Sequence, residues 1–138
     1  MSPTLSGSCG CGAVRFEVSE PLVTAYYCHC TRCQKRTGTA AQASAVVAPG
    51  SVTITTGEEH VRDWRPPGGM GKAFCALCGS HIFARDPETG AIRAVRMAAI
   101  DGDAGVRPSY RQFLAYAPAW EPIPDDGLPR YDERAPRR

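Results

Sequence analysis

The sequence predicts a small, mainly β domain in which the turns of antiparallel sheets carry metal ligands. Short segments alternate between apolar and polar residues, as strands with one buried face do. The 14 glycines and 12 prolines are spread through the chain and disfavour long helices. Seven cysteines fall into three tight clusters next to the predicted strands. The 138 residues predict a single domain, 1–138, with a core of about 5–131 and a basic tail at 132–138.

Alternation is clearest over 13–18, which we expect to be the first strand. Val14, Phe16 and Val18 would face the core, and Arg15 and Glu17 would face solvent. Segment 23–28 is rich in β-branched and aromatic residues and leads into the second cysteine cluster. Further strands are expected at 42–48, 52–55, 80–85 and 92–98, and Ala73 and Phe74 are expected to lead as a strand into the third cysteine cluster.

One segment, 31–37, is expected to be helical. Thr31 is a candidate N-cap, and Gly38 is a candidate stop. The segment after Pro108 is expected to be irregular, because prolines recur in it and each one removes a backbone donor. These prolines are Pro118, Pro122, Pro124 and Pro129.

The three cysteine clusters are Cys9-x-Cys11, Cys28-x-Cys30-x-x-Cys33 and Cys75-x-x-Cys78. Disulfide scaffolds use an even number of cysteines, and residues 1–8 carry neither the charged nor the apolar region of a signal peptide. Pairs spaced this closely are typical of metal sites, because their thiolates converge on one ion. The pattern therefore favours metal binding over disulfides, and a cytoplasmic location.

Spacing leaves two ways to divide the seven cysteines. In the first, the first and third clusters form a closed four-cysteine site, and the middle cluster forms a three-cysteine site with an open fourth position. In the second, the last two cysteines of the middle cluster join the third cluster as a zinc ribbon. We favour the first, because residues i and i+2 of an extended strand point the same way and every cysteine is then used. An open position is where metal chemistry takes place.

The three motifs and their surroundings resemble those of the glutathione-dependent formaldehyde-activating enzyme family, which includes the centromere protein V domain. The matching segments are 7–18 (GSCGCGAVRFEV), 27–38 (YCHCTRCQKRTG) and 74–80 (FCALCGS). The resemblance extends from about residue 7 to residue 131 and implies a β-tent fold with two zinc ions. It assigns the structural zinc to Cys9, Cys11, Cys75 and Cys78, and the catalytic zinc to Cys28, Cys30 and Cys33.

The resemblance also implies a carbon–sulfur lyase that joins or cleaves glutathione and formaldehyde. Three thiolates on zinc leave a fourth position where a small thiol can bind and ionise. The cations Arg32, Lys35 and Arg36 flank the middle cluster and would meet the carboxylates of glutathione. A second hypothesis is a non-catalytic, zinc-stabilised binding module, as the centromere protein V relatives suggest.

Other features bound the function. His29 lies between two predicted ligands and would point away from the metal, so we expect a structural hydrogen-bonding role. Residues 111–113 read RQF where many members carry a His-Ile-Trp-like element, so the substrate wall should differ. A net charge of +2 does not indicate nucleic acid, and no apolar run approaches the roughly 18 residues of a membrane span.

Overall fold

The computed structural model describes residues 5–136 and is mainly β, as the sequence predicts. Its strands are β1 (Leu5–Ser8), β2 (Arg15–Val18), β3 (Thr24–Cys28), β4 (Gln42–Val46), β5 (Val52–Thr56), β6 (Val61–Trp64), β7 (Gly71–Cys75), β8 (His81–Arg85), β9 (Ile92–Arg96) and β10 (Pro108–Gln112). One α-helix, α1 (Thr31–Thr37), is accompanied by three 3₁₀ turns: η1 (Glu58–His60), η2 (Met97–Ala99) and η3 (Leu114–Tyr116). No helix in the described part of the chain is long and apolar enough to cross a bilayer.

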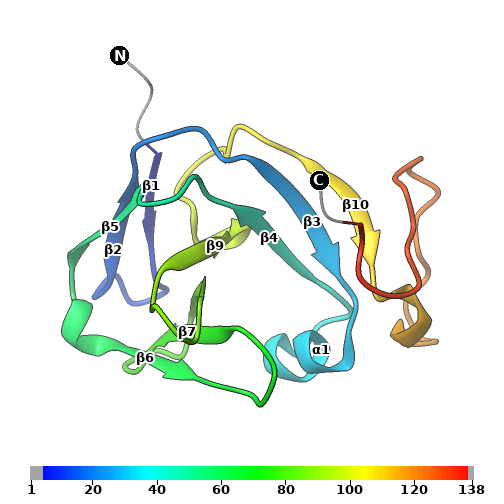
Figure 1. Cartoon of the computed structure of the whole chain (residues 1–138), viewed down its shortest axis with the longest axis horizontal. Coiled ribbons are helices and arrows are strands. Elements are labelled where there is room, and N and C mark those ends of the chain that lie inside the picture. Colours follow the sequence, from blue (N-terminus) through cyan, green and yellow to red (C-terminus); the bar gives the residue numbers. More distant parts are fainter. Residues whose placement is uncertain (1–4, 137–138) are drawn as a thin grey trace.

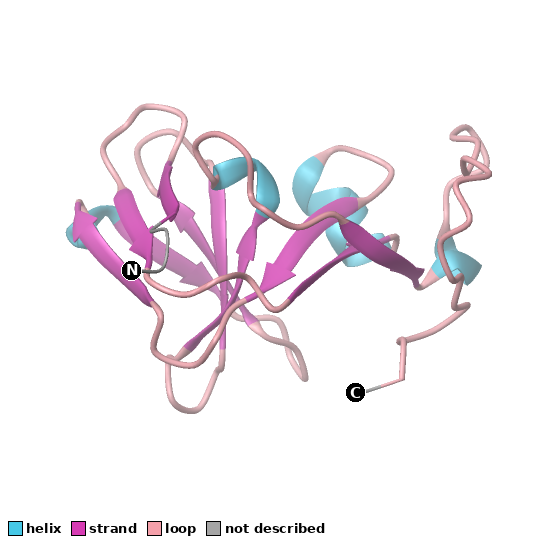
Figure 2. Ribbon diagram, turned by 90° about the horizontal axis from the view of Figure 1, so that it is seen from above, coloured by secondary structure: helices cyan, strands magenta, loops and turns pink. Residues whose placement is uncertain are grey.

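The strands form two sheets (Figure 1). The smaller sheet has the order β1-β2-β5, and the larger has the order β10-β3-β4-β9-β8-β7-β6. All strand pairs are antiparallel except β10 with β3. Seen from above, the strands converge toward one side of the molecule and spread apart toward the other (Figure 2). Helix α1 connects the C-terminal end of β3 to the N-terminal end of β4 and lies at this edge of the large sheet (Figure 1).

The core lies between the two sheets. A cross-strand row of small and apolar side chains runs through the large sheet as Ala25, Ala45, Val95, Phe83 and Ala73, and each is almost completely buried. The small sheet contributes Phe16, whose ring packs edge-on against Phe83 with centroids 4.9 Å apart. Because neighbouring residues of a strand point to opposite faces, the residues next to this row project from the other face of the sheet.

Three strand assignments differ from the sequence-based prediction. Strands β1 and β6 were not expected, and segment 108–112 forms β10 where irregular structure was expected. The many prolines after residue 108 were the reason for expecting irregular structure. Pro108 is compatible with a strand because it occupies the first position of an edge strand, where the missing N–H costs little. Strand β10 also needs a distant partner, since it pairs in parallel with β3.

The predicted helix begins and ends as expected, with one correction at its start. The N-cap is Cys30 and not Thr31, because the Cys30 sulfur accepts a hydrogen bond from the backbone N–H of Cys33. Gly38 ends the helix with φ 72°, the left-handed conformation that a glycine adopts without steric penalty.

The C-terminal segment, including the start of the expected basic tail at 132–138, is attached to β10. The N–H of Phe113 donates to the carbonyl of Glu133, and the N–H of Ala135 donates to Oε1 of Gln112. The end of the expected tail, 137–138, lies outside the described residues.

Candidate metal centres

The first and third cysteine clusters meet at one place in the fold. Cys9 and Cys11 belong to the turn between β1 and β2, where the N–H of Gly12 donates to the carbonyl of Cys9. Cys75 ends β7, and Cys78 lies in the tight turn that leads to β8. The four sulfur atoms lie within 4.8 Å of one another. A turn from each sheet therefore contributes two thiols to a single cluster.

The geometry of this four-cysteine cluster suits a tetrahedral metal ion. The Sγ atoms of Cys9 and Cys11 are 3.6 Å apart, and those of Cys11 and Cys75 are 3.9 Å apart. A tetrahedral zinc ion with bonds of about 2.3 Å holds its sulfur ligands about 3.8 Å from one another. These separations are too long for a disulfide, and all seven cysteines are free.

Polar groups around the four-cysteine cluster stabilise ionised sulfur. The backbone N–H of Val14 donates to the Cys9 sulfur at 3.3 Å. The Ser80 hydroxyl lies 3.2 Å from the Cys78 sulfur and, with backbone donors, lowers the pKa of that thiol to about 5. The same hydroxyl oxygen accepts from the N–H of Gly10 and so connects the two turns.

The middle cluster forms a separate trio of sulfurs at the junction of β3 and α1. Cys28 is the last residue of β3, Cys30 caps the helix, and Cys33 lies in its first turn. Their sulfurs also lie within 4.8 Å of one another, and Cys28 and Cys33 are buried. The trio is therefore built from one short stretch of chain, and no fourth His, Cys, Asp or Glu among the described residues completes it.

Sharing of hydrogen bonds within the trio favours ionisation of Cys30. Contacts from the thiols of Cys28 and Cys33 lower the pKa of Cys30 to about 2, and the N–H of Cys33 adds to this effect. The pKa of Cys28 is raised, first by its contact with Cys30. Three thiols that share protons in this way are suited to binding a cation, because metal ligation requires the thiolate form.

The structure groups the cysteines as the first of the two divisions does, but the local reason is different. Cys9 and Cys11 come together through a turn and not along an extended strand. In the trio, the capping turn at Cys30 brings the three sulfurs together. The zinc-ribbon division would require Cys30 and Cys33 to reach the third cluster, and they lie in the other group.

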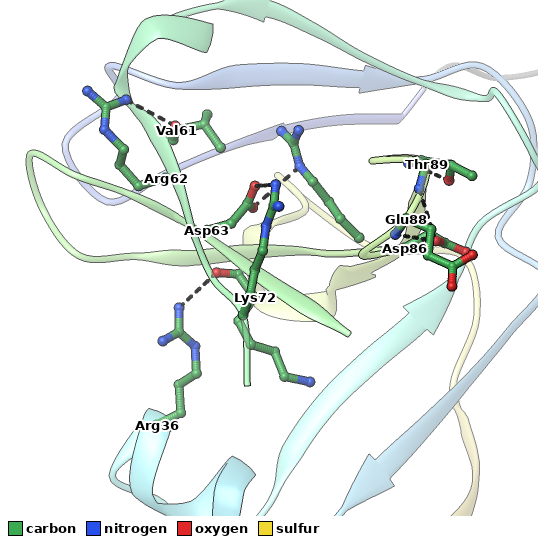
Figure 3. Close-up of polar contacts among 11 residues, drawn as sticks. Arg36, Val61, Arg62, Asp63, Lys72, Asp86, Glu88 and Thr89 are labelled. Atoms are coloured by element: carbon green, nitrogen blue, oxygen red, sulfur yellow. Dashed lines mark hydrogen bonds and ion pairs between the residues drawn. The ribbon is translucent and has the colours of Figure 1, made fainter. Parts of the chain in front are cut away.

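The three predicted thiol-binding cations share one surface. With Thr31 and Trp64 they line a cavity of about 570 Å³ beside α1, and no cysteine of the trio is among its lining residues. Arg36 is partly engaged elsewhere, since its Nη2 donates to the carbonyl of Lys72 at 3.2 Å (Figure 3). Its guanidinium also lies over the ring of Trp64. Arg32 and Lys35 are exposed and remain available for an anionic ligand.

Two groups of residues near the trio were not identified from the sequence. The side-chain amide of Gln34 donates to the carbonyls of His29 and Tyr116, which fixes the start of α1 to the segment after β10. On the sheet face that carries Cys28, Arg96 and Lys72 project from β9 and β7. Period-two alternation within β9 was the available signal for Arg96, but it does not say what covers that face.

The chain is similar to known proteins over most of its length. The family model described as glutathione-dependent formaldehyde-activating enzyme matches residues 4–116. A protein of Halomonas elongata, whose name provisionally gives it that activity, is 31% identical over 118 residues, covering 80% of this chain and 73% of its own. A crystal structure of a Rhodobacter sphaeroides protein has a TM-score of 0.55 and 25% identity, and covers 70% of this chain and 88% of that one.

Proposed function

The chain belongs to the glutathione-dependent formaldehyde-activating enzyme family, and we propose that it is a zinc-dependent carbon–sulfur lyase acting on a small thiol, in the first place glutathione, and formaldehyde or a similar aldehyde. The observation that carries this proposal is the division of seven free cysteines into a group of four and an open group of three. A closed group suits a structural ion, and an open one suits a substrate.

The reaction adds the thiol across the carbonyl bond. The sulfur forms a bond to the aldehyde carbon, the carbon–oxygen π bond breaks, and the oxygen takes a proton to give the S-hydroxymethyl product; the reverse reaction cleaves the carbon–sulfur bond. A free thiol has a pKa near 8.5, so only a few per cent of it is ionised at neutral pH. A divalent ion held by Cys28, Cys30 and Cys33 would supply the position at which that thiol ionises.

The residues of this chain would position the two substrates. Arg32 and Lys35 would hold the carboxylates of glutathione in the cavity beside α1. Gln34 would keep the trio in place against the wall formed after β10, because its amide connects the backbone on both sides. Holding a thiol and an aldehyde together raises their effective concentration, which is the main contribution expected for so simple an addition.

The four-cysteine cluster would act as the structural centre. Its thiols come from segments far apart in the chain, so one ion would join the small sheet to the β7–β8 turn. Metal analysis of protein purified without chelator should give about two zinc equivalents per chain. A value of one would argue against a second, functional site and in favour of a binding module.

Exchange spectroscopy tests the activity directly. With ¹³C-formaldehyde and glutathione, the protein should accelerate exchange between hydrated formaldehyde and S-hydroxymethylglutathione. Cys30→Ser should abolish the acceleration and Ser6→Ala, a substitution in β1 away from the trio, should not. If wild-type protein with two zinc ions leaves the exchange rate at its spontaneous value, the lyase assignment is wrong.

A further inference from the structure

Arg96 is a buried cation without a carboxylate partner. The residue is 7% exposed, and its Nη1 donates to the Ser44 hydroxyl at 2.7 Å. Its Nε and Nη2, which lie on the same edge of the guanidinium, have no hydrogen-bond partner, and no described carboxylate forms an ion pair with it. An unpaired buried charge is costly, so a compensating negative charge is expected nearby.

A second cation, Lys72, lies on the same face of the sheet in β7. In Figure 3 its amino group is free of dashed contacts, and no described carboxylate forms an ion pair with it. Burial lowers the pKa of Lys72, and the charge of Arg96 lowers it further, whereas the thiolates of Cys33 and Cys30 act in the opposite direction. The strand register gives the geometry: Lys72 pairs with Ala84, and Ala84 pairs with Ala94, which is two residues from Arg96. The two cations therefore project from the same face of the sheet.

The trio provides the negative charge that both cations lack. Cys33 and Cys28 are among the groups whose charge favours the protonated form of Arg96. Both sulfurs are buried, so water cannot screen them effectively. The four-cysteine cluster differs, since Cys11 and Cys78 are exposed and solvent can balance its charge.

Arg111 is the internal comparison for Arg96. It is equally buried, but its Nη2 is paired with the carboxylate of Asp126 at 2.8 Å. Arg111 pairs with Tyr27 and so projects from the sheet face opposite to that of Cys28, whereas Arg96 projects from the same face as Cys28. The fold thus supplies a carboxylate for the buried arginine on the opposite face and none for the arginine on the face of Cys28.

Counting formal charges shows what the two cations would balance. Three thiolates and a divalent ion carry one net negative charge, and a thiolate in the fourth position makes this two. Arg96 and Lys72 together carry two positive charges. An anionic fourth ligand therefore offsets more of this buried positive charge than a neutral ligand does.

We infer that Arg96 and Lys72 are specificity-determining residues that select an ionised thiol over a neutral ligand at the open position of the trio. The inference rests on the proposed function and adds to it: selection would depend on the charge of the sulfur itself, separately from any carboxylate that the thiol carries. Both are positioning residues, because they act through the charge of the trio.

Cobalt-substituted protein allows a direct test with two probes. The first probe, 2-mercaptoethanol, binds as a thiolate and has no carboxylate; the second, imidazole, binds as a neutral donor. In Arg96→Met and Lys72→Met, the dissociation constant for 2-mercaptoethanol, followed by sulfur-to-cobalt charge-transfer bands, should rise about tenfold or more. The constant for imidazole should change about twofold at most. Arg62→Met removes the same charge from an exposed position of β6 and should change neither constant.

Each further outcome supports or overturns the inference. Arg96→Lys should recover most of the thiol affinity, and together with Lys72→Met it carries the test if Arg96→Met does not fold. Equal loss of both ligands in the variants, or no loss of either, would overturn the inference and leave the proposed function intact. Wild-type cobalt protein that binds neither probe would overturn the proposed function, and the inference with it.

Discussion

Arg111 contacts His29 directly, with its Nη1 3.3 Å from Nε2 of the imidazole. Both side chains are buried, and the guanidinium also lies over the ring of Tyr27 at 4.3 Å. Burial, and then the charge of Arg111, lower the pKa of His29 and so favour a neutral ring that accepts from the guanidinium. The first residue of the RQF segment, Arg111, thus holds this histidine in place.

The pair of Arg111 and Asp126 should make stability depend on acid pH. Its hydrogen bond with Arg111 lowers the pKa of Asp126, so the ion pair stabilises the fold above about pH 4 and is lost as the pH falls through the folded-state pKa. Asp126→Asn should therefore be less stable than wild type at pH 7, and the gap should shrink toward pH 3. Denaturant unfolding at both pH values measures it. Asp125→Asn, at the exposed neighbour, is the matched control, and a gap independent of pH would contradict the prediction.

The two sulfur groups should differ in their contribution to stability. Cys75→Ser removes a ligand from the cluster that joins the two sheets, so it should lower the free energy of unfolding by several kcal/mol, since structural zinc supplies on the order of 10 kcal/mol in zinc-finger peptides. Cys30→Ser changes a site within residues 28–33 and should cost clearly less. Thermal melts of both zinc-loaded variants give the comparison. Equal losses would indicate that both groups are structural.

Recognition of glutathione should depend on its carboxylates. Arg32→Gln with Lys35→Gln should raise the half-saturating glutathione concentration about three- to tenfold, because these exposed cations line the cavity beside α1. The value for 2-mercaptoethanol should stay constant, and the glutathione effect should weaken with added salt. Arg62→Gln, an exposed arginine of β6 outside this cavity, is the control. An equal effect on both thiols would mean that the two cations stabilise helix α1 and do not bind the carboxylates of glutathione.

Two glycines with the same backbone conformation allow the cost of backbone strain to be distinguished from the cost of a steric clash. Gly57 and Gly90 have φ of 80° and 75°, so alanine at either should cost about 1–2 kcal/mol of unfolding free energy. A Cβ at Gly57 would also overlap the carbonyl of Ala13, whereas nothing lies near one at Gly90. Gly57→Ala should therefore cost about 1–3 kcal/mol more than Gly90→Ala in denaturant unfolding. Equal costs would mean that the backbone at Ala13 can move away from the added Cβ at little energetic cost.

The parts of the fold that depend on local sequence were predictable. Helix 31–37 was found because Gly38 marks its end, and the strand around Phe16 was found because its alternation is regular. Local signals could not reveal β10, because its pairing with β3 depends on residues about 80 positions away. They also could not reveal the role of Arg96. An arginine in an alternating strand is expected to face solvent, and the sequence does not show which parts of the chain cover that face of the sheet.

The division of the cysteines has a consequence for the order in which the protein assembles. The trio lies within residues 28–33, so its sulfurs can be gathered by a loop whose closure entropy is small, as soon as that stretch leaves the ribosome. The four-cysteine cluster joins residues 9 and 11 to residues 75 and 78, and it can form only after more than half of the chain has been made. A scarce metal would therefore reach the local site first during synthesis, and the non-local site would complete the domain only afterwards.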